Sequence, residues 1–205
     1  MSLLSDQGLE VIYEHGVLRG EVLGLEVART VGDQLEVGVG RHDRAARFEM
    51  RPAEDPRAGL AEAASAVRSM RVAGAPRHPA NTLARGRWLR SVVCSSPSSI
   101  GLSWLEPVAP PLPWFDLPEA GAAPAVGRAP DGSPVIAVCS VGIDLDLVPT
   151  AADCRLLYGS PSVSLWLVVP EGDDVPVTRA LAGSLDPPAE VRVVPKGWDS
   201  ANTPT

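Results

Sequence analysis

The segment "SVGIDLDLVPTAAD" (Ser140–Asp153) places two carboxylates, Asp144 and Asp146, one residue apart between an apolar run and a helical pattern. Glu171 follows the next apolar run, and Asp43 follows the glycine-rich end of an earlier one. Carboxylate oxygens are the ligands that Mg²⁺ and Mn²⁺ prefer. Asp144 and Asp146 are therefore candidate catalytic and metal-binding residues, and Glu171 and Asp43 are the candidates that would complete a Mg²⁺ or Mn²⁺ site.

The same acidic residues also have a purely structural interpretation, and the sequence leaves both open. Aspartate favours turns and helix N-caps, because its side chain accepts hydrogen bonds from nearby backbone amides. Asp153 stands three residues after Thr150, in the spacing of a capping box, and Asp174 shortly precedes Pro176, as an N-cap would. Asp144 and Asp146 fit a turn that leads into a helix equally well.

A second polar group follows a predicted strand in "GVGRHDR" (Gly38–Arg44). The guanidinium group of arginine matches planar oxyanions such as phosphate and carboxylate. We list as candidate anion-binding residues Arg41, His42, Arg44, Arg85 and Arg87. Arginines at the end of a strand are also common on ordinary protein surfaces, and this second interpretation stays open too.

The net charge of −7 hides an asymmetry along the chain. Residues 41–90, the arginine-rich region, contain eleven arginines against five acidic residues, whereas the remainder contains seven basic and twenty acidic residues. Such a region could bind an anionic partner, nucleic acid included. It could equally pair with the acidic part of the same chain, or of a second copy in a homo-oligomer.

Lysine and cysteine usage exclude several classes of function. Lys196 is the only lysine against seventeen arginines, a bias typical of a GC-rich bacterial genome. No GxxxxGK[ST] phosphate loop occurs, and a Schiff-base enzyme would have only Lys196 available. The three cysteines are odd in number and form no CxxC motif, and no apolar run is long enough to span a bilayer. We therefore expect a cytoplasmic protein with no membrane contact.

The first half of the chain predicts strands followed by two helices. Strands at about 24–31 and 35–40 flank Gly32-Asp33-Gln34, which we interpret as a three-residue hairpin loop. This pairing puts Arg29 on the apolar face of the hairpin. One helix begins after the N-cap candidate Asp55, and a second runs from about Asn81 to Cys94.

The last third alternates apolar runs with helical patterns. Residues 134–195 read as strand, helix, strand, helix and strand, and their short links favour parallel pairing through right-handed crossovers. The predicted fold class is α/β, with an N-terminal antiparallel β segment, two central helices and a C-terminal parallel βαβαβ unit in a mixed sheet. The predicted boundaries are 1–105 for the β-hairpin and two-helix segment, 106–133 for a Pro/Ala/Gly-rich connection, 134–195 for the βαβαβ unit and 196–205 for a flexible tail, within one domain or two lobes.

Residues 134–195, with the β-rich segment before them, resemble the core of the PD-(D/E)xK nucleases. In that family a strand carrying acidic residues is followed by a helix, a strand ending near "VVPE", another helix and a last strand. "LEVGVGRHDR" (Leu35–Arg44) is also similar to the approach to the family's acidic residue, which would involve Asp43. The family's strand carries an ExK or DxK triplet whose lysine polarises the attacking water, but Asp144-Leu145-Asp146 contains no lysine. The resemblance thus implies a nuclease-like fold without its catalytic lysine.

Two functional hypotheses follow from the sequence. The first, which we favour, is a non-catalytic or catalytically decayed protein that binds a protein, an anion or a nucleic acid through the arginine-rich region. The second is a Mg²⁺- or Mn²⁺-dependent hydrolase or nuclease-like enzyme that uses Asp144 and Asp146. The missing lysine and the missing motif partners count against the second.

Overall fold

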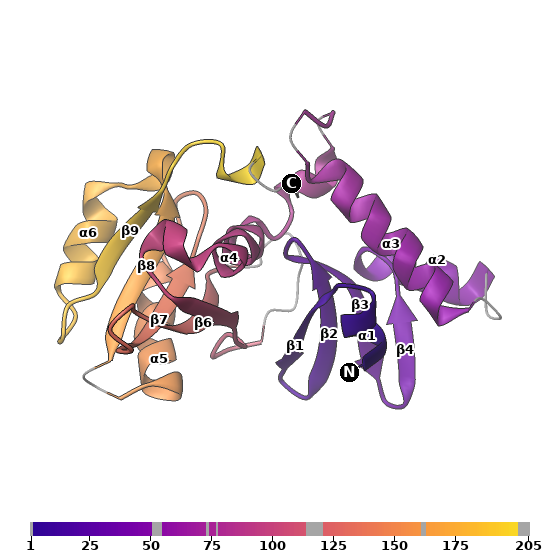
Figure 1. Ribbon diagram of the computed structural model, residues 1–205, viewed down its shortest axis with the longest axis horizontal. Coiled ribbons are helices and arrows are strands. Elements are labelled where there is room, and N and C mark those ends of the chain that lie inside the picture. Colours follow the sequence, from indigo (N-terminus) through magenta and orange to yellow (C-terminus); the bar gives the residue numbers. More distant parts are fainter. Residues whose placement is uncertain are drawn as a thin grey trace.

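The protein folds as two β-sheets with helices between and around them (Figure 1). The computed structural model describes residues 2–50, 55–72, 74–76, 78–113, 121–160 and 163–200, and the side chains of residues 2, 41, 42 and 48–50 lie outside this description. The first half of the chain contains α1 (Ser2–Asp6), β1 (Glu10–Glu14), β2 (Val17–Val22), β3 (Leu25–Val31), β4 (Gln34–Val37), α2 (Gly40–Met50), α3 (Pro56–Met70), η1 (Pro79–Thr82) and α4 (Arg85–Ser95). The second half contains η2 (Pro97–Ile100), β5 (Trp104–Pro107), β6 (Ala123–Arg128), β7 (Pro134–Cys139), α5 (Leu147–Tyr158), β8 (Ser164–Pro170), η3 (Glu171–Asp173), α6 (Pro176–Gly183), β9 (Glu190–Val194) and η4 (Trp198–Ser200).

The N-terminal sheet is an antiparallel meander in the order β1-β2-β3-β4. Tight turns join its strands, and glycines with positive φ, such as Gly16 and Gly24, permit their left-handed backbone. Leu25, Val27 and the apolar stripe of α3 form its core. α3 begins where the sequence predicted, because the Asp55 side chain accepts a hydrogen bond from the Arg57 amide.

The register between β3 and β4 differs from the sequence prediction. Val31 pairs with Gln34 across a two-residue turn, so Arg29 lies opposite Glu36 rather than among apolar side chains. Arg29 Nε and Glu36 Oε2 are 3.0 Å apart. The predicted three-residue loop is therefore wrong. That prediction was chosen to keep the apolar residues of the two strands on one face, whereas the register in the folded sheet allows an ion pair between the strands.

The C-terminal sheet has the order β5-β6-β7-β8-β9, with β7, β8 and β9 parallel as predicted and β5, β6 and β7 antiparallel. Alternate residues of β7 face opposite sides: Ala137 packs with α4 and η4, and Val138 packs with α5 and α6. This two-sided burial explains why β7 and β8 are almost wholly apolar. The predicted α/β architecture is confirmed.

Two other expectations need correction, and one helix was not expected. The expected connection at 106–133 contains the end of β5 and all of β6, so part of it belongs to the sheet. The expected tail from residue 196 includes Trp198, which is 6% exposed and packs edge-on against Trp88, with ring centroids 5.5 Å apart. α2 was not predicted, because its sequence "GRHDRAARFEM" has too few apolar residues to show a helical period.

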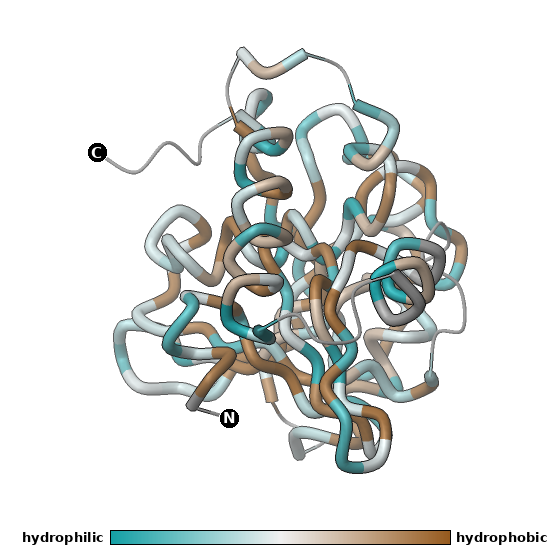
Figure 2. Tube along the Cα trace, turned by 90° about the vertical axis from the view of Figure 1, so that its right-hand side faces the viewer, coloured by the Kyte–Doolittle hydropathy of each residue, from teal (hydrophilic) through white to brown (hydrophobic). Residues whose placement is uncertain are grey.

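Hydrophobic and hydrophilic residues are interspersed along the chain trace (Figure 2). In the part of the chain that the structure describes, no helix combines the length and apolar character needed to cross a bilayer.

Candidate functional site

The loops that follow β7 and β8 meet at the carboxyl edge of the C-terminal sheet. The Gly142 amide donates a hydrogen bond to Asp173 Oδ2 over 2.7 Å, which joins the β7–α5 loop to η3. This bond brings the loop that carries Asp144 and Asp146 next to η3, which carries Glu171 and Asp173, so carboxylates from both segments lie at this edge. The bond itself shows what one of those carboxylates does, which is to hold a neighbouring loop in place.

Asp144 is also engaged within the β7–α5 loop. Ser140 Oγ donates to Asp144 Oδ2 over 2.7 Å, and the Asp146 amide donates to Asp144 Oδ1 over 3.0 Å. Both carboxylate oxygens therefore accept hydrogen bonds from residues nearby in sequence, the arrangement of an aspartate that fixes a turn.

The other predicted metal ligands do not assemble around Asp144. Asp146 lies at the N-cap position of α5, and Glu171 is exposed in η3. Asp43 lies in α2, beside the N-terminal sheet, where its Oδ2 accepts a hydrogen bond from the Val39 amide over 2.8 Å. Among the described residues, no three His, Cys, Asp or Glu side chains are grouped so that they could hold a metal ion.

The β7–α5 loop instead presents large apolar side chains to solvent. Ile143 is 81% exposed and Leu145 is 77% exposed, whereas Asp144 between them is turned into the loop's hydrogen bonds. Val177 and Leu181, one turn apart on α6, are exposed as well. α6 begins just after η3, the turn to which the loop is bonded.

Two of the predicted anion-binding arginines, Arg44 and Arg87, belong to a different arrangement, a buried network of ion pairs that involves α2, α4 and the N-terminal sheet. Arg87 Nη2 lies 3.0 Å from Glu14 Oε2, and the same guanidinium pairs with Glu21. Arg90 Nη2 lies 2.9 Å from Glu21 Oε2. Glu21 has no exposed surface and Arg87 is 8% exposed, so these charges are satisfied inside the molecule.

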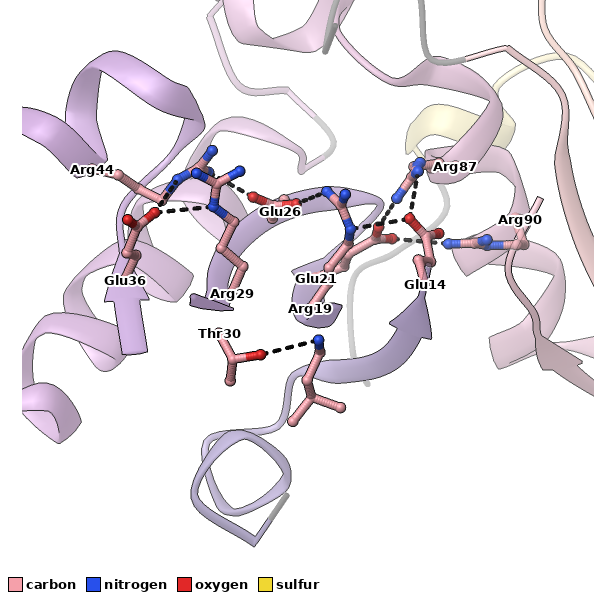
Figure 3. Close-up of polar contacts among 11 residues, drawn as sticks. Glu14, Arg19, Glu21, Glu26, Arg29, Thr30, Glu36, Arg44, Arg87 and Arg90 are labelled. Carbon is pink, nitrogen blue, oxygen red and sulfur yellow. Dashed lines mark hydrogen bonds and ion pairs between the residues drawn. The ribbon is translucent and has the colours of Figure 1, made fainter. Parts of the chain in front are cut away.

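The network continues across the sheet towards α2 (Figure 3). Arg19 pairs with Glu14 and Glu26, and Arg44 pairs with Glu26 and Glu36. We call the whole set the charge ladder; its members are Glu14, Arg19, Glu21, Glu26, Arg29, Glu36, Arg44, Arg87 and Arg90. Each of its four glutamates contacts two arginines, so no carboxylate of the ladder is left to recruit a cation from outside.

The pKa directions follow from burial and from these charges. Burial alone would raise the pKa of the Glu21 carboxyl, but the charges of Arg87 and Arg90 outweigh it and hold that pKa below its ordinary value. Glu10, which accepts a hydrogen bond from Ser91 Oγ, has its pKa raised, chiefly by burial. The two arginines therefore favour the ionised form of Glu21, whereas burial disfavours the ionised form of the neighbouring Glu10.

Each predicted anion-binding residue can now be placed. Arg44 and Arg87 are buried ladder members, which corrects the expectation that they bind an external anion. Arg85 lies 3.4 Å from Asp199 Oδ2 and stands over the Trp198 ring, so it fastens the C-terminal segment to α4. The side chains of Arg41 and His42 lie outside the described residues.

Sequence reasoning missed the glutamates of the ladder, although the chain carries a signal for them. The tripeptide Leu-Glu-Val recurs at 9–11, 25–27 and 35–37, and each time an acidic residue stands between two apolar ones in a strand. Glu10 contacts Ser91, and Glu26 and Glu36 belong to the ladder. A glutamate inside an apolar strand, in a chain rich in arginine, indicates a buried ion pair.

Comparison of the chain with protein-family models, with curated proteins and with solved structures gives no significant match.

Proposed function

We propose that this chain is a non-catalytic binding protein that docks another protein on the β7–α5 loop, Gly142–Asp146, which we call the docking loop. The observation that carries the proposal is the exposure of Ile143 and Leu145 on a loop whose aspartate is committed to holding its shape. Large apolar side chains on a rigid, exposed loop are a feature of interaction sites, because they gain free energy only when a partner covers them. Full burial of each would contribute about 1.5–3 kcal/mol.

The composition of β7 supports a non-catalytic function. The resemblance to PD-(D/E)xK nucleases would place acidic residues and a lysine on the strand that precedes the crossover helix. That strand is β7, whose sequence "PVIAVC" contains neither and is buried beyond its first residue. Lys196, the only lysine of the chain, follows β9. We propose a nuclease-like architecture from which the hydrolytic residues are missing.

The position of the docking loop supports a binding role. Ligands of α/β proteins with parallel strands bind at the carboxyl edge of the sheet, where loops vary without disturbing the core. The docking loop stands at that edge, and α6, which begins after the neighbouring η3, also carries exposed apolar side chains, Val177 and Leu181. The arginine-rich region is a weaker candidate for the binding surface, because Arg44, Arg87 and Arg90 form ion pairs within the charge ladder.

The proposal is tested by placing a photo-crosslinking amino acid at position 143 in the cells that produce the protein. A discrete adduct is expected at 143, lost when Leu145 is replaced by serine. The control position is Tyr13, which is comparably exposed but lies on β1 of the other sheet. Equal labelling at 143 and 13, or no adduct at 143, would refute the docking function.

A further inference from the structure

The electrostatics of the docking loop define the kind of partner it fits. Five acidic residues lie in the docking loop and in the adjoining residues 171–174, namely Asp144, Asp146, Glu171, Asp173 and Asp174. Neither the docking loop nor residues 171–174 contain lysine or arginine, and Arg179 of α6 is paired with Asp174. The exposed apolar side chains of Ile143 and Leu145 are therefore framed by negative charge.

The internal contacts divide these carboxylates into two groups. Asp144 and Asp173 accept backbone hydrogen bonds, and Asp174 pairs with Arg179, whose Nε lies 2.7 Å from its Oδ1. Asp146 and Glu171 are exposed, and no ion pair among the described residues neutralises either of them. One lies in the docking loop itself and the other in η3, which is bonded to that loop, and both are available to a cation from outside.

This charge pattern decides between classes of partner. Nucleic acids and anionic membrane surfaces bind proteins through lysine and arginine, which release counterions from phosphates. The docking loop and residues 171–174 have no such residue, and their carboxylates repel phosphate. A protein segment that carries both cations and large apolar side chains would complement both the carboxylates and the apolar side chains of the docking loop. Its cations would steer the encounter, and its apolar groups would supply affinity.

We propose that the docking loop binds a basic, amphipathic segment of another protein, in which lysine or arginine residues flank large apolar side chains. The apolar residues of that segment cover Ile143 and Leu145, and its cations approach Asp146 and Glu171. The inference rests on the proposed docking function and adds the chemistry of the partner.

Three labelled synthetic peptides test this inference by fluorescence anisotropy. The first is an amphipathic helix of lysine and leucine, the second replaces every lysine by glutamate, and the third replaces every leucine by serine. The lysine–leucine peptide is expected to bind at least roughly tenfold more tightly than either of the others. Its affinity is expected to fall severalfold between low and moderate salt, as electrostatically steered binding does.

Matched variants localise the binding. The double variant Ile143→Ser, Leu145→Ser is expected to abolish binding, and Asp146→Asn with Glu171→Gln to weaken it severalfold. Glu190→Gln, which removes an exposed carboxylate from β9, is the control and is expected to leave affinity unchanged. Equal binding of the glutamate–leucine peptide, or binding that survives the double variant, overturns the inference, and so does binding of an RNA oligonucleotide or anionic vesicles that the double variant abolishes.

The outcome separates this inference from the proposed function. If no peptide binds but the crosslink at position 143 forms, the docking function stands and the partner is not a basic segment. If neither occurs, both proposals fail.

Discussion

Arg87 of α4 and Glu21 of β2 form an ion pair in which the carboxylate has no exposed surface. α4 packs its apolar side chains, including Trp88 and Leu89, on the C-terminal sheet. The arginine, by contrast, points to the N-terminal sheet, so one helix joins the two sheets through two kinds of contact (Figures 1 and 3). The charge ladder therefore serves as the joint between the halves of the molecule.

Replacing Glu21 by glutamine should destabilise the protein by about 3–5 kcal/mol, because Arg87 and Arg90 would keep buried charges with fewer partners. Urea unfolding measures this loss. Glu190→Gln is the control, since its pair with Arg192 is largely exposed and such pairs contribute less than about 1 kcal/mol. Similar small effects of both substitutions would show that water reaches the joint.

Glu10 should make the stability of the protein depend on pH. Burial raises the pKa of its carboxyl above 4.5, the nearby charge of Glu21 raises it further, and Ser91 and Arg90 lower it in part. A carboxyl whose pKa is raised by folding stabilises the protein below its ordinary pKa and loses that contribution as pH rises through the folded-state value. Glu10→Gln removes this loss and should preserve the hydrogen bond to Ser91.

The free energy of unfolding of Glu10→Gln relative to wild type should therefore increase as pH rises from about 4 to 7. Urea titrations at a series of pH values measure the difference. A difference that does not vary with pH would mean that Glu10 is as well solvated in the fold as in the unfolded chain.

Gly24 sets how closely the β2–β3 turn approaches α4. Its φ is +77°, and a Cβ atom there would overlap the backbone of Arg87 and Trp88. Gly32, with φ +58° and nothing within 4 Å, provides the control. Gly32→Ala should cost about 1–2 kcal/mol for the left-handed backbone alone. Gly24→Ala should cost a further 1–3 kcal/mol or so through overpacking, and equal losses of unfolding free energy would contradict this close approach.

His15 is an opportunity to stabilise the chain. It adopts φ +48° in the turn between β1 and β2 and is exposed beside Gly16. Asparagine tolerates the left-handed region, and Asn-Gly is a favoured two-residue hairpin turn. His15→Asn should raise the unfolding free energy by about 0.5–1 kcal/mol, measured by urea unfolding. His15→Ala should give no gain, and an equal gain from alanine would mean that the effect does not come from the turn.

The parts of the fold that sequence reasoning predicted are those encoded locally. The apolar runs of β7 and β8, with short links through α5, require parallel strands buried on both faces, and Asp55 before Pro56 marks the start of α3. The β3–β4 register was harder to predict from the sequence, because it follows the ion pair between Arg29 and Glu36 across the turn rather than a common apolar face.

Neither the charge ladder nor the exposure of the docking loop could be predicted from the local sequence, and the reasons differ. Arg87 and Glu14 are 73 residues apart in the chain, and nothing in a single sequence says which of many charges meet. In the docking loop, "IDLD" alternates apolar and acidic side chains. Hydrogen bonds from Ser140 and Asp146 to Asp144 hold that aspartate in the loop and leave the apolar side chains facing solvent. These bonds are apparent only in the folded structure.

Asp144 provides a direct test of the turn interpretation against the metal interpretation. Asp144→Ala removes the acceptor for Ser140 and Asp146 and should lower stability by about 1–2 kcal/mol, whereas Asp144→Asn retains the turn geometry and should cost less. A metal site occupied at a hundred times its Kd would add about 2.7 kcal/mol, or about 5–10 °C in melting temperature at this chain length.

Because both oxygens of Asp144 are engaged within the loop, the melting temperature of the wild type should be the same in excess Mn²⁺ and in EDTA. A rise of the calculated size in Mn²⁺ that Asp144→Asn abolishes would instead identify the aspartates as metal ligands. The hydrolase hypothesis would then replace the docking function. A rise that Asp144→Asn leaves intact would place the metal elsewhere, and the assignment of Asp144 to the turn would stand.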